Sequence, residues 1–314
     1  MKLSQRVSQI AISSTANVFA QVTQLKAEGV NLVDLGPGEP DFPTPENIKH
    51  AAIQAIHANF TRYTSTDGIM QLKEAIIQRH AQDFQSDFTT NEVLVTAGGK
   101  HAIFNLINSL IESGDEVIIP SPYWVTFREA VHYASGCCQF VPTTESDNFR
   151  LTASQIESAF SPKTRLIMLN SPNNPSGAII RTEEMKKIAD LARCRGTIVL
   201  TDECYCHFNY QDLKPFSLAS LGKAYRDHVV VVGSVSKTYA MTGWRVGFCL
   251  GPAKLIKAML KIQSHCTSNV NSIAQKAAVE ALVGPQTSIL EMLGEYTRRR
   301  EFIINALNSI PGIT

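Results

Sequence analysis

The stretch EVLVTAGGKHAIFNLINSLIESGDEVIIP, residues 92–120, decides the fold class. It begins with a β-branched run at 92–96 and continues through a Gly-Gly pair into a helical pattern over 100–111. After a Ser-Gly-Asp break it reaches a second β-branched run at 116–120. A strand, a helix and another strand in this order are typical of a parallel sheet with helices on its faces.

The same alternation continues along most of the chain. Further strands are expected at 138–141, 165–169, 197–201, 228–233 and 246–250, and further helices at 124–134, 182–193 and 252–263. Strands this rich in Val and Ile are buried on both faces. The sequence therefore predicts an α/β fold, with a mostly parallel seven-stranded sheet sandwiched by helices.

The two ends of the chain do not follow this alternation. Residues 1–45 hold a helical pattern at 15–28, a short apolar piece and a loop rich in Gly and Pro, and one long helical pattern follows Pro285. We expect the two ends to form a second, smaller α/β domain beside a large domain at 46–284. Residues 285–314 would then be a long helix leading into that small domain, which is cut short.

Composition excludes several classes of function. The chain has 314 residues and a formal net charge of +1. It therefore lacks the excess of Lys and Arg with which proteins bind the phosphates of nucleic acids. It contains no apolar run of membrane-spanning length and no secretory leader pattern. Its seven cysteines are an odd number without metal-knuckle spacing. We therefore expect a cytoplasmic protein with reduced thiols and no metal site.

A lysine follows the strand expected at 228–233. Lys237 lies among small hydroxyl residues at the carboxyl end of that strand, where open α/β sheets bind their ligands. A desolvated lysine there can form an imine with a carbonyl compound. Ser234, Ser236 and Arg245 nearby would supply donors to a phosphate. The alternative, from the residues alone, is an ordinary surface lysine.

Two further strand ends carry candidate residues. Gly98 and Gly99 lead from a strand into a helix, whose N-terminus favours an anion, although a plain glycine turn has the same sequence. Asp202 ends the apolar strand expected at 197–201, where a carboxylate needs a cationic partner such as a protonated pyridine nitrogen. A cap on the next segment is the alternative for Asp202.

An amide and an indole follow two other strands. Asn174 lies in NSPNNPSG (170–177), whose prolines and glycine make a rigid turn that can fix its side chain as a hydrogen-bond donor. Trp124 lies in SPYW (121–124) and can offer a flat face to an aromatic ring. A purely structural turn and an ordinary core tryptophan are the alternatives.

Together these motifs resemble a known family. The chain is similar to the fold-type I, pyridoxal-phosphate-dependent aminotransferases of class I/II, and most similar to the bacterial-type aspartate aminotransferases. The resemblance rests on motifs in the family order: GEPDF (38–42), YTSTDG (63–68), TAGGK (96–100), SPYW (121–124), NSPNNPSG (170–177), TDECY (201–205) and SVSKTYAMTGWRVG (234–247). It covers about residues 30–310 and makes residues 46–284 the expected cofactor-binding domain.

The resemblance implies roles around pyridoxal 5'-phosphate. Lys237 would hold the cofactor covalently and move a proton during catalysis, and Asp202 would pair with the ring nitrogen. Tyr205 and Asn174 would bond the 3-oxygen of the ring, and Trp124 would stack on it. Lys237, Asp202 and Tyr205 are the implied catalytic residues.

The resemblance also implies a phosphate site and a homodimer. The phosphate would be bound by Gly99, Lys100, Ser234, Ser236 and Arg245, and by Tyr63 from the partner subunit. The active sites would thus be shared between two subunits.

On the substrate side, the resemblance implies an amino acid and a 2-oxo acid. Gly38 would lie near the α-carboxylate, with Trp124 and Asn174 also facing the substrate. Lys100 would bind the distal carboxylate of an acidic substrate, and Ser13 and Thr15 would help to close the site. The expected reaction moves an amino group from L-aspartate, or a similar acidic amino acid, to 2-oxoglutarate.

Two alternatives remain open at this point. An aromatic, prephenate or alanine-type aminotransferase shares every cofactor residue. Chains of this family run beyond the point where this sequence stops, and the missing part carries the arginine that binds the α-carboxylate. A truncated, catalytically impaired homologue that binds the cofactor is therefore the second alternative.

Overall fold

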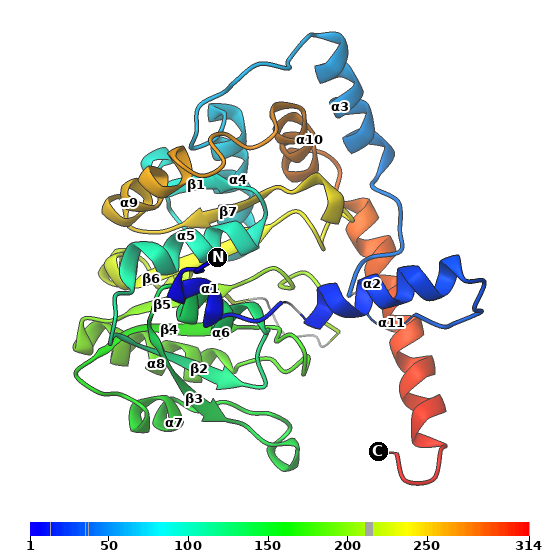
Figure 1. Ribbon diagram of the computed structural model, residues 1–314. Helices are drawn as coiled ribbons and strands as arrows, with labels where there is room; N and C mark the ends of the chain where they lie inside the picture. The colour runs from blue at the N-terminus through cyan, green and yellow to red at the C-terminus, as the bar shows by residue number, and fades with distance from the viewer. Residues whose placement is uncertain (13, 35, 37, 211–215, 314) are drawn as a thin grey trace.

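A seven-stranded sheet forms the centre of the computed structural model, which describes residues 1–12, 14–34, 36, 38–210 and 216–313 (Figure 1). The strands are β1 (Val93–Thr96), β2 (Glu116–Ser121), β3 (Cys137–Pro142), β4 (Thr164–Asn170), β5 (Ile198–Asp202), β6 (Val229–Ser234) and β7 (Gly247–Leu250). Their order is β1-β7-β6-β5-β4-β2-β3, and β7 runs antiparallel to both of its neighbours while the other pairs are parallel. The predicted mostly parallel seven-stranded sheet is confirmed.

Helices cover both faces of this sheet (Figure 1). The short N-terminal helices are α1 (Gln5–Ser8) and α2 (Ser14–Ala27), and the long C-terminal helix is α11 (Thr287–Asn308). Between them lie α3 (Glu46–His57), α4 (Met70–Phe84), α5 (Gly99–Leu110), α6 (Thr126–Tyr133), α7 (Ala153–Ser158), α8 (Thr182–Arg195), α9 (Ala253–Ser264) and α10 (Ser272–Val283). None of the helices in these ranges is long and apolar enough to cross a membrane.

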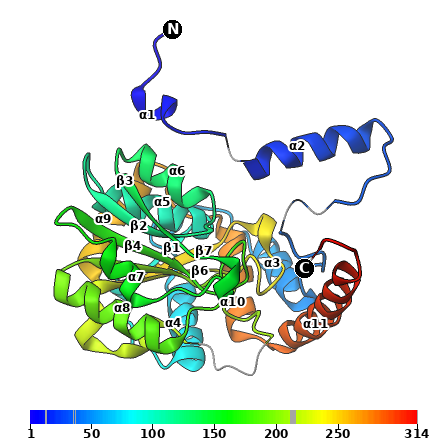
Figure 2. The ribbon, with the colours of Figure 1, turned by 90° about the horizontal axis from the view of Figure 1, so that it is seen from below.

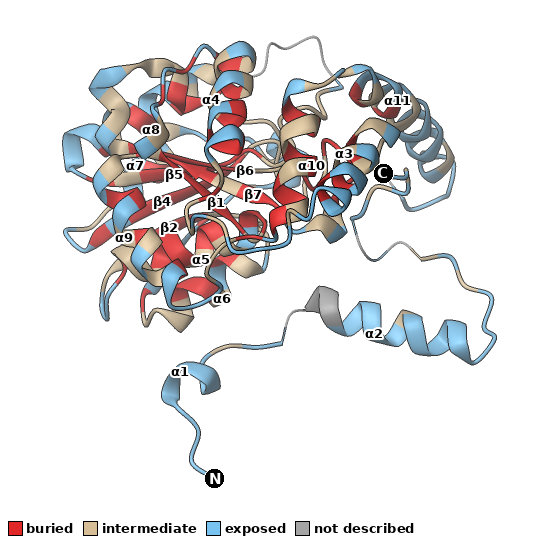
Figure 3. Ribbon diagram, turned by 90° about the horizontal axis from the view of Figure 1, so that it is seen from above, coloured by how far each residue is buried: buried red, intermediate tan, exposed pale blue. Residues whose placement is uncertain are grey.

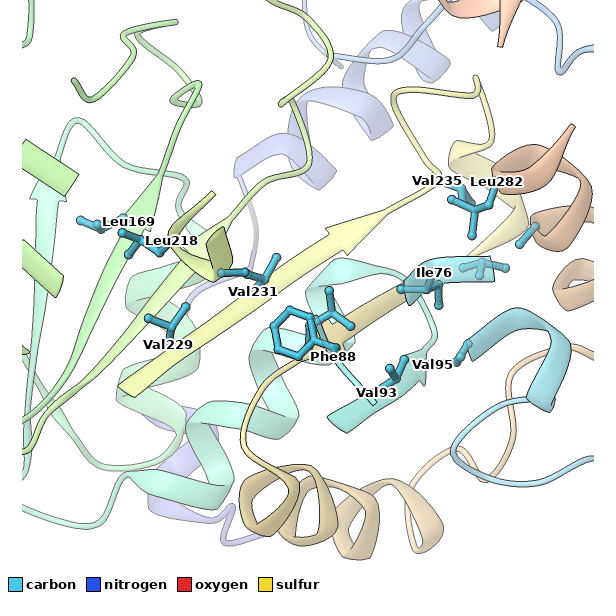
Figure 4. Close-up of a cluster of buried hydrophobic side chains, with 14 of the residues drawn as sticks. Ile76, Phe88, Val93, Val95, Leu169, Leu218, Val229, Val231, Val235 and Leu282 are labelled. Atoms are coloured by element: carbon cyan, nitrogen blue, oxygen red, sulfur yellow. The ribbon is translucent and has the colours of Figure 1, made fainter. Parts of the chain in front are cut away.

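The strands place alternate side chains in two apolar clusters, one on each face of the sheet. Val229 and Val231 of β6 pack in the cluster under α3, α4, α8 and α10, with Phe88 nearby (Figure 4). Val230 and Val232 point into the other cluster, under α5, α6 and α9. Successive side chains of a strand therefore point into two separate apolar clusters, and the sheet is buried on both faces.

The chain ends pack far less. Helices α1 and α2 project from the body (Figure 2), and α2 and much of α11 are exposed (Figure 3). The backbone N–H of Ala11 donates to the carboxylate of Glu129 at 2.8 Å, which ties this projecting segment to α6. Within α11 the buried residues are Ile289 and Met292, while Phe302 is 68% exposed.

Candidate active site

The carboxyl ends of β4, β5 and β6 open into a cavity of about 1190 Å³. Most of the residues singled out in the sequence line it: Gly38, Gly99, Lys100, Trp124, Asn174, Asp202, Tyr205, Ser234, Ser236, Lys237 and Arg245. Tyr63 is not among the lining residues and is 92% exposed. Ser13 lies outside the described residues, as does the side chain of Thr15. The structure thus brings the cofactor candidates together, and their roles stay predictions.

Asp202 is held at the end of β5. Its backbone pairs with Asn170 and Val232 on the neighbouring strands, and the residue is 4% exposed. The carboxylate accepts the backbone N–H of Cys204 at 3.1 Å. Burial raises the pKa of Asp202, and no positively charged group among the described residues opposes that shift. Such a carboxylate is suited to a protonated nitrogen entering from the cavity.

Lys237 lies just beyond β6, on the same side of the sheet. Its Nζ donates to the backbone carbonyl oxygen of Gly38 at 2.5 Å. Burial lowers the pKa of Lys237, the positive charge of Arg245 adds to this shift, and the negative charge of Glu39 opposes it. A lysine whose neutral form is favoured in this way is a better nucleophile and proton acceptor.

The start of α5 is suited to an anion. The backbone N–H groups of Gly99 and Lys100 have no hydrogen-bond partner among the described residues, and no side chain caps this helix. Free N–H groups at a helix N-terminus attract an anion. The Oγ of Ser234, which accepts the backbone N–H of Ser236 at 3.3 Å, lines the same cavity.

Arg245 adds a fixed positive charge to this anion site. Its Nη1 donates to the carbonyl oxygen of Thr242 at 2.8 Å and its Nη2 to that of Ala97 at 3.4 Å. Gly98 lets the guanidinium approach, because a Cβ at Gly98 would lie 2.3 Å from Nη2 of Arg245. Gly98 also has a φ of +83°, which side-chain-bearing residues rarely adopt.

Aromatic and amide groups line another part of the cavity. The Nδ2 of Asn174 donates to the Tyr205 hydroxyl at 3.4 Å, and burial raises the pKa of Tyr205 to about 12. The backbone N–H of Asn174 donates to Oδ1 of Asn170 at 2.7 Å, which fixes the turn. Lys100 Nζ lies 5.1 Å from the ring centre of Trp124, and burial followed by the charge of Arg245 lowers the pKa of Lys100.

Comparison with known proteins identifies the family of this chain. The family model "Aminotransferase class I and II" matches residues 30–314. The aspartate/prephenate aminotransferase of Nitrosomonas europaea is 45% identical over all of this chain and 79% of its own length. The chain belongs to the class I and II aminotransferases. It is therefore an enzyme that transfers amino groups.

Solved aminotransferase structures share the fold. The aspartate aminotransferase of Thermus thermophilus, solved with maleate, superposes with a TM-score of 0.95 at 37% identity, over 98% of this chain and 81% of that one. The enzyme from Rhizobium meliloti gives a TM-score of 0.94 at 39% identity, over 99% of this chain and 78% of that one.

Sequence reasoning missed several lining residues of this aminotransferase. Cys204 reaches the cavity beside Ser234, with Sγ 3.5 Å from its Oγ. Arg300 of α11 also lines the cavity, with its guanidinium 5.4 Å from the ring centre of Tyr210. Consecutive helix residues point in different directions, so Arg299 pairs with Asp41 at 2.9 Å while Arg300 faces the cavity. The sequence shows three consecutive arginines at 298–300, but the direction of each side chain cannot be seen in it.

Proposed function

We propose that this aminotransferase binds pyridoxal 5'-phosphate and moves an amino group from L-aspartate, or a similar acidic amino acid, to 2-oxoglutarate. One observation carries the proposal. A single cavity joins a buried carboxylate without a cationic partner, a lysine of lowered pKa and an open anion site, at Asp202, Lys237 and the start of α5. These three groups fit the ring nitrogen, the aldehyde and the phosphate of that cofactor.

The residues present would hold this cofactor at both ends. Ser234, Ser236, Arg245 and the N–H groups at the start of α5 would bind the phosphate, and Lys237 would bind the aldehyde carbon. When bound, the cofactor supplies a cationic ring that stabilises negative charge on the α-carbon of the substrate.

The chain's own groups then control protons. The carboxylate of Asp202 keeps the proton on the ring nitrogen, since burial strengthens an ionic hydrogen bond that water would otherwise weaken. Lys237 takes the proton of the substrate α-carbon on its Nζ. The same nitrogen then delivers a proton to the carbon on the far side of the nitrogen that is transferred. The Tyr205 hydroxyl and the Asn174 amide orient the ring through its 3-oxygen, and Trp124 covers one face.

Lys100 favours an acidic substrate. Its ammonium group lines the cavity beside Trp124, where a second carboxylate on the substrate can pair with it. The solved Thermus thermophilus relative contains maleate, which is a dicarboxylate. The aspartate aminotransferase of Geobacillus stearothermophilus is 40% identical over all of this chain. These points support aspartate over neutral amino acids.

An aromatic or prephenate substrate is the second candidate. Phe208, Tyr210 and Tyr296 line one part of the cavity, and the ring of Tyr296 lies 5.5 Å from that of Phe208 in an edge-on contact. The Nitrosomonas europaea relative carries both substrates in its name. An aromatic substrate ring can pack against such edges.

We also propose a cytoplasmic homodimer with a two-domain organisation. The sheet and helices α3 to α10 lie within residues 46–284, which supports that range as the large cofactor-binding domain. The exposed Tyr63 is available to reach the cofactor phosphate of a second subunit. The seven cysteines are all unpaired, as the reducing cytoplasm favours.

A substrate panel tests the function. The chain loaded with pyridoxal phosphate is mixed with aspartate, alanine or phenylalanine, and conversion of the bound aldehyde to the amine is followed by absorbance. We expect the fastest conversion with aspartate. Lys100→Met should lower kcat/KM for aspartate by about 10- to 100-fold, the loss of one charge-assisted bond, and leave alanine unchanged. Lys223→Met, at an exposed lysine outside the cavity, is the matched control.

An equal loss for alanine and aspartate in Lys100→Met would remove the assignment of Lys100. Faster conversion of phenylalanine than of aspartate would favour the aromatic alternative. No conversion with any amino acid would contradict transamination by this chain.

A further inference from the structure

A second, smaller cavity lies behind the active site, next to α4. It has about 40 Å³ of room for water-sized molecules and is lined by side chains that include Asp83, Cys206, His207 and Thr238. Cys204 faces the active-site cavity, whereas Cys206, two residues further along the same turn, lines this second one. The proposed function uses none of these four groups.

A chain of short contacts connects the thiol to a carboxylate. The Sγ of Cys206 lies 3.2 Å from Nδ1 of His207, and Nε2 of the same imidazole lies 3.1 Å from Oδ2 of Asp83. Asp83 accepts the N–H at Nε2, which leaves the lone pair of Nδ1 directed at the thiol. This is the order of nucleophile, base and orienting acid that activates a nucleophile.

The charges around His207 favour its protonated form. The pKa of His207 is raised to about 10, chiefly because the Cys206 sulfur, once ionised, stabilises the positive charge of the imidazole; burial opposes the shift and the bond to Asp83 adds to it, so a proton taken from the thiol is held on His207. Arg79 shares Asp83, with its Nε 3.4 Å from Oδ2. Thr238 places its Oγ1 3.3 Å from Nδ1 of His207.

The other titratable groups of this cavity are engaged elsewhere. His80 bonds Ser86 at 2.7 Å and Glu203 at 3.3 Å, so neither ring nitrogen is left for Cys206. The hydroxyl of Tyr239 donates to Gln286 at 2.9 Å, and burial raises the pKa of this tyrosine. His207 is therefore the base that the geometry assigns to the thiol.

We propose that Cys206 is a reactive thiol that hydrogen peroxide oxidises to a sulfenic acid, with His207 as its base and Asp83 as a positioning residue. His207 takes the thiol proton, and the sulfur attacks one oxygen of the peroxide. The S–O bond forms as the O–O bond breaks, so sulfur loses two electrons and the peroxide gains them. The leaving hydroxide takes the proton from His207 and departs as water.

The size of the cavity fits this oxidant. A water needs about 10–15 Å³ of such room, so about 40 Å³ admits a molecule with two oxygen atoms. Bulky disulfides would not fit inside it. Cys206 itself is partly exposed, which leaves a route from solvent.

The remaining cysteines provide internal references. Burial raises the pKa of Cys204 well above its usual range and raises that of Cys138 to about 12, so both thiols stay protonated. Cys194 lies exposed on α8. It reports the rate of an accessible thiol that the His207–Asp83 pair does not activate.

Site-resolved trapping of sulfenic acid tests the proposal. The full chain is treated with limiting hydrogen peroxide, trapped with a dimedone reagent and analysed by peptide mass spectrometry. We expect Cys206 to be trapped about tenfold faster than Cys194, because His207 takes the proton of the thiol. His207→Asn should bring Cys206 to the rate of Cys194. Asp83→Asn should slow Cys206 as well, and Asp83→Glu should restore part of the rate.

Cys206→Ser confirms the identity of the trapped peptide, and circular dichroism checks the fold of each variant. If His207→Asn does not fold, the slowing of Cys206 in Asp83→Asn and its rescue in Asp83→Glu carry the test. Trapping of Cys206 no faster than Cys194, or an unchanged rate in a folded His207→Asn chain, would overturn the proposal. Each readout is independent of the cofactor and of amino transfer, so the proposed function can fail or hold separately.

Discussion

The two walls of the active-site cavity are built differently. On the sheet side, Asp202 is 4% exposed and is fixed by strand pairing on both sides. On the side of the chain ends, Arg300 of α11 lines the cavity, while its neighbour Arg299 is joined outside the lining to Asp41 at 2.9 Å, with these two side chains 43% and 62% exposed. Among the described residues, Asp202 is thus packed between buried strands, whereas the Asp41–Arg299 pair is open to solvent.

This difference separates two tasks. The sheet wall carries the groups that fit the cofactor, and close packing preorganises them. The wall from the chain ends is held to the sheet by a few contacts, among them the bond from Lys237 to Gly38 and the bond from Thr44 Oγ1 to the carbonyl of Ala240 at 2.7 Å. We infer that changes in the sheet wall affect cofactor chemistry strongly and that changes in the other wall affect it weakly.

The largest effect is expected at Lys237. Lys237→Ala removes the amine that would bind the aldehyde and move the α-proton, so kcat should fall by about 10⁴ or more. The visible absorption of the loaded protein should disappear with it. A variant that stays yellow and can still be reduced by borohydride would show that another lysine has this role.

Asp202→Asn should give the next largest effect, a loss in kcat of about 10³, because a neutral amide cannot hold the proton on the ring nitrogen. Steady-state kinetics of the loaded enzyme measure this loss. Asp227→Asn is the matched control, because it makes the same chemical change outside the cavity. Asn170 is not a suitable control position, because its side chain donates to the backbone carbonyl oxygen of Asp202.

The same variant tests the burial of the carboxylate. Because the pKa of Asp202 is raised in the folded chain, the folded state binds this proton more tightly than the unfolded chain does. Without cofactor, wild-type stability should fall as the pH rises from about 4 through the raised pKa. Asp202→Asn should lack this fall and melt at a higher temperature at pH 7. An identical pH profile for both chains would contradict a buried carboxylate with a raised pKa.

A smaller effect is expected where Gly98 meets the side chain of Arg245. Gly98→Ala places a methyl group against Arg245, so cofactor affinity should fall by about tenfold in addition to about 1–3 kcal/mol of backbone strain. Gly196→Ala is the matched control, because its φ of +67° carries similar strain while nothing lies within 4 Å of the added Cβ. Thermal melts should shift in both, and the Kd for pyridoxal phosphate only in Gly98→Ala. Equal Kd values would argue against the role of Arg245.

The smallest effect is expected at the chain ends. Arg299→Met breaks an exposed ion pair, which contributes little in water. The Kd for pyridoxal phosphate should change by less than about twofold, as measured by fluorescence titration. A change in Kd as large as that of Gly98→Ala would show that both walls contribute equally to cofactor affinity.

The sequence predicted the sheet wall better than the rest. Each expected strand lies within one residue of an observed one at either end, because β-branched runs between turn residues are a strong local signal. Helices α3 and α4 were not predicted. They come before β1, and the alternation of strands and helices on which the prediction rested begins only at β1. The spacing of Ile48, Ala52 and Ala55, which are all buried in α3, was an available signal.

Contacts between distant segments could not be predicted from local pattern. The pair of Asp83 and His207 joins residues 124 positions apart, and only the packing of α4 against the turn after β5 brings them together. The same holds for Arg300, whose side chain reaches the cavity through the path of α11. Motif order predicted which residues would gather at the sheet edge, because strand ends converge there.

Borohydride reduction of the chain loaded with pyridoxal phosphate, followed by peptide mass spectrometry, tests the central claim most directly. We expect the reduced pyridoxyl group on Lys237, with the modification lost in Lys237→Ala and kept in Lys223→Met. A pyridoxyl group on a different lysine, or on none, would contradict the assignment of this cavity.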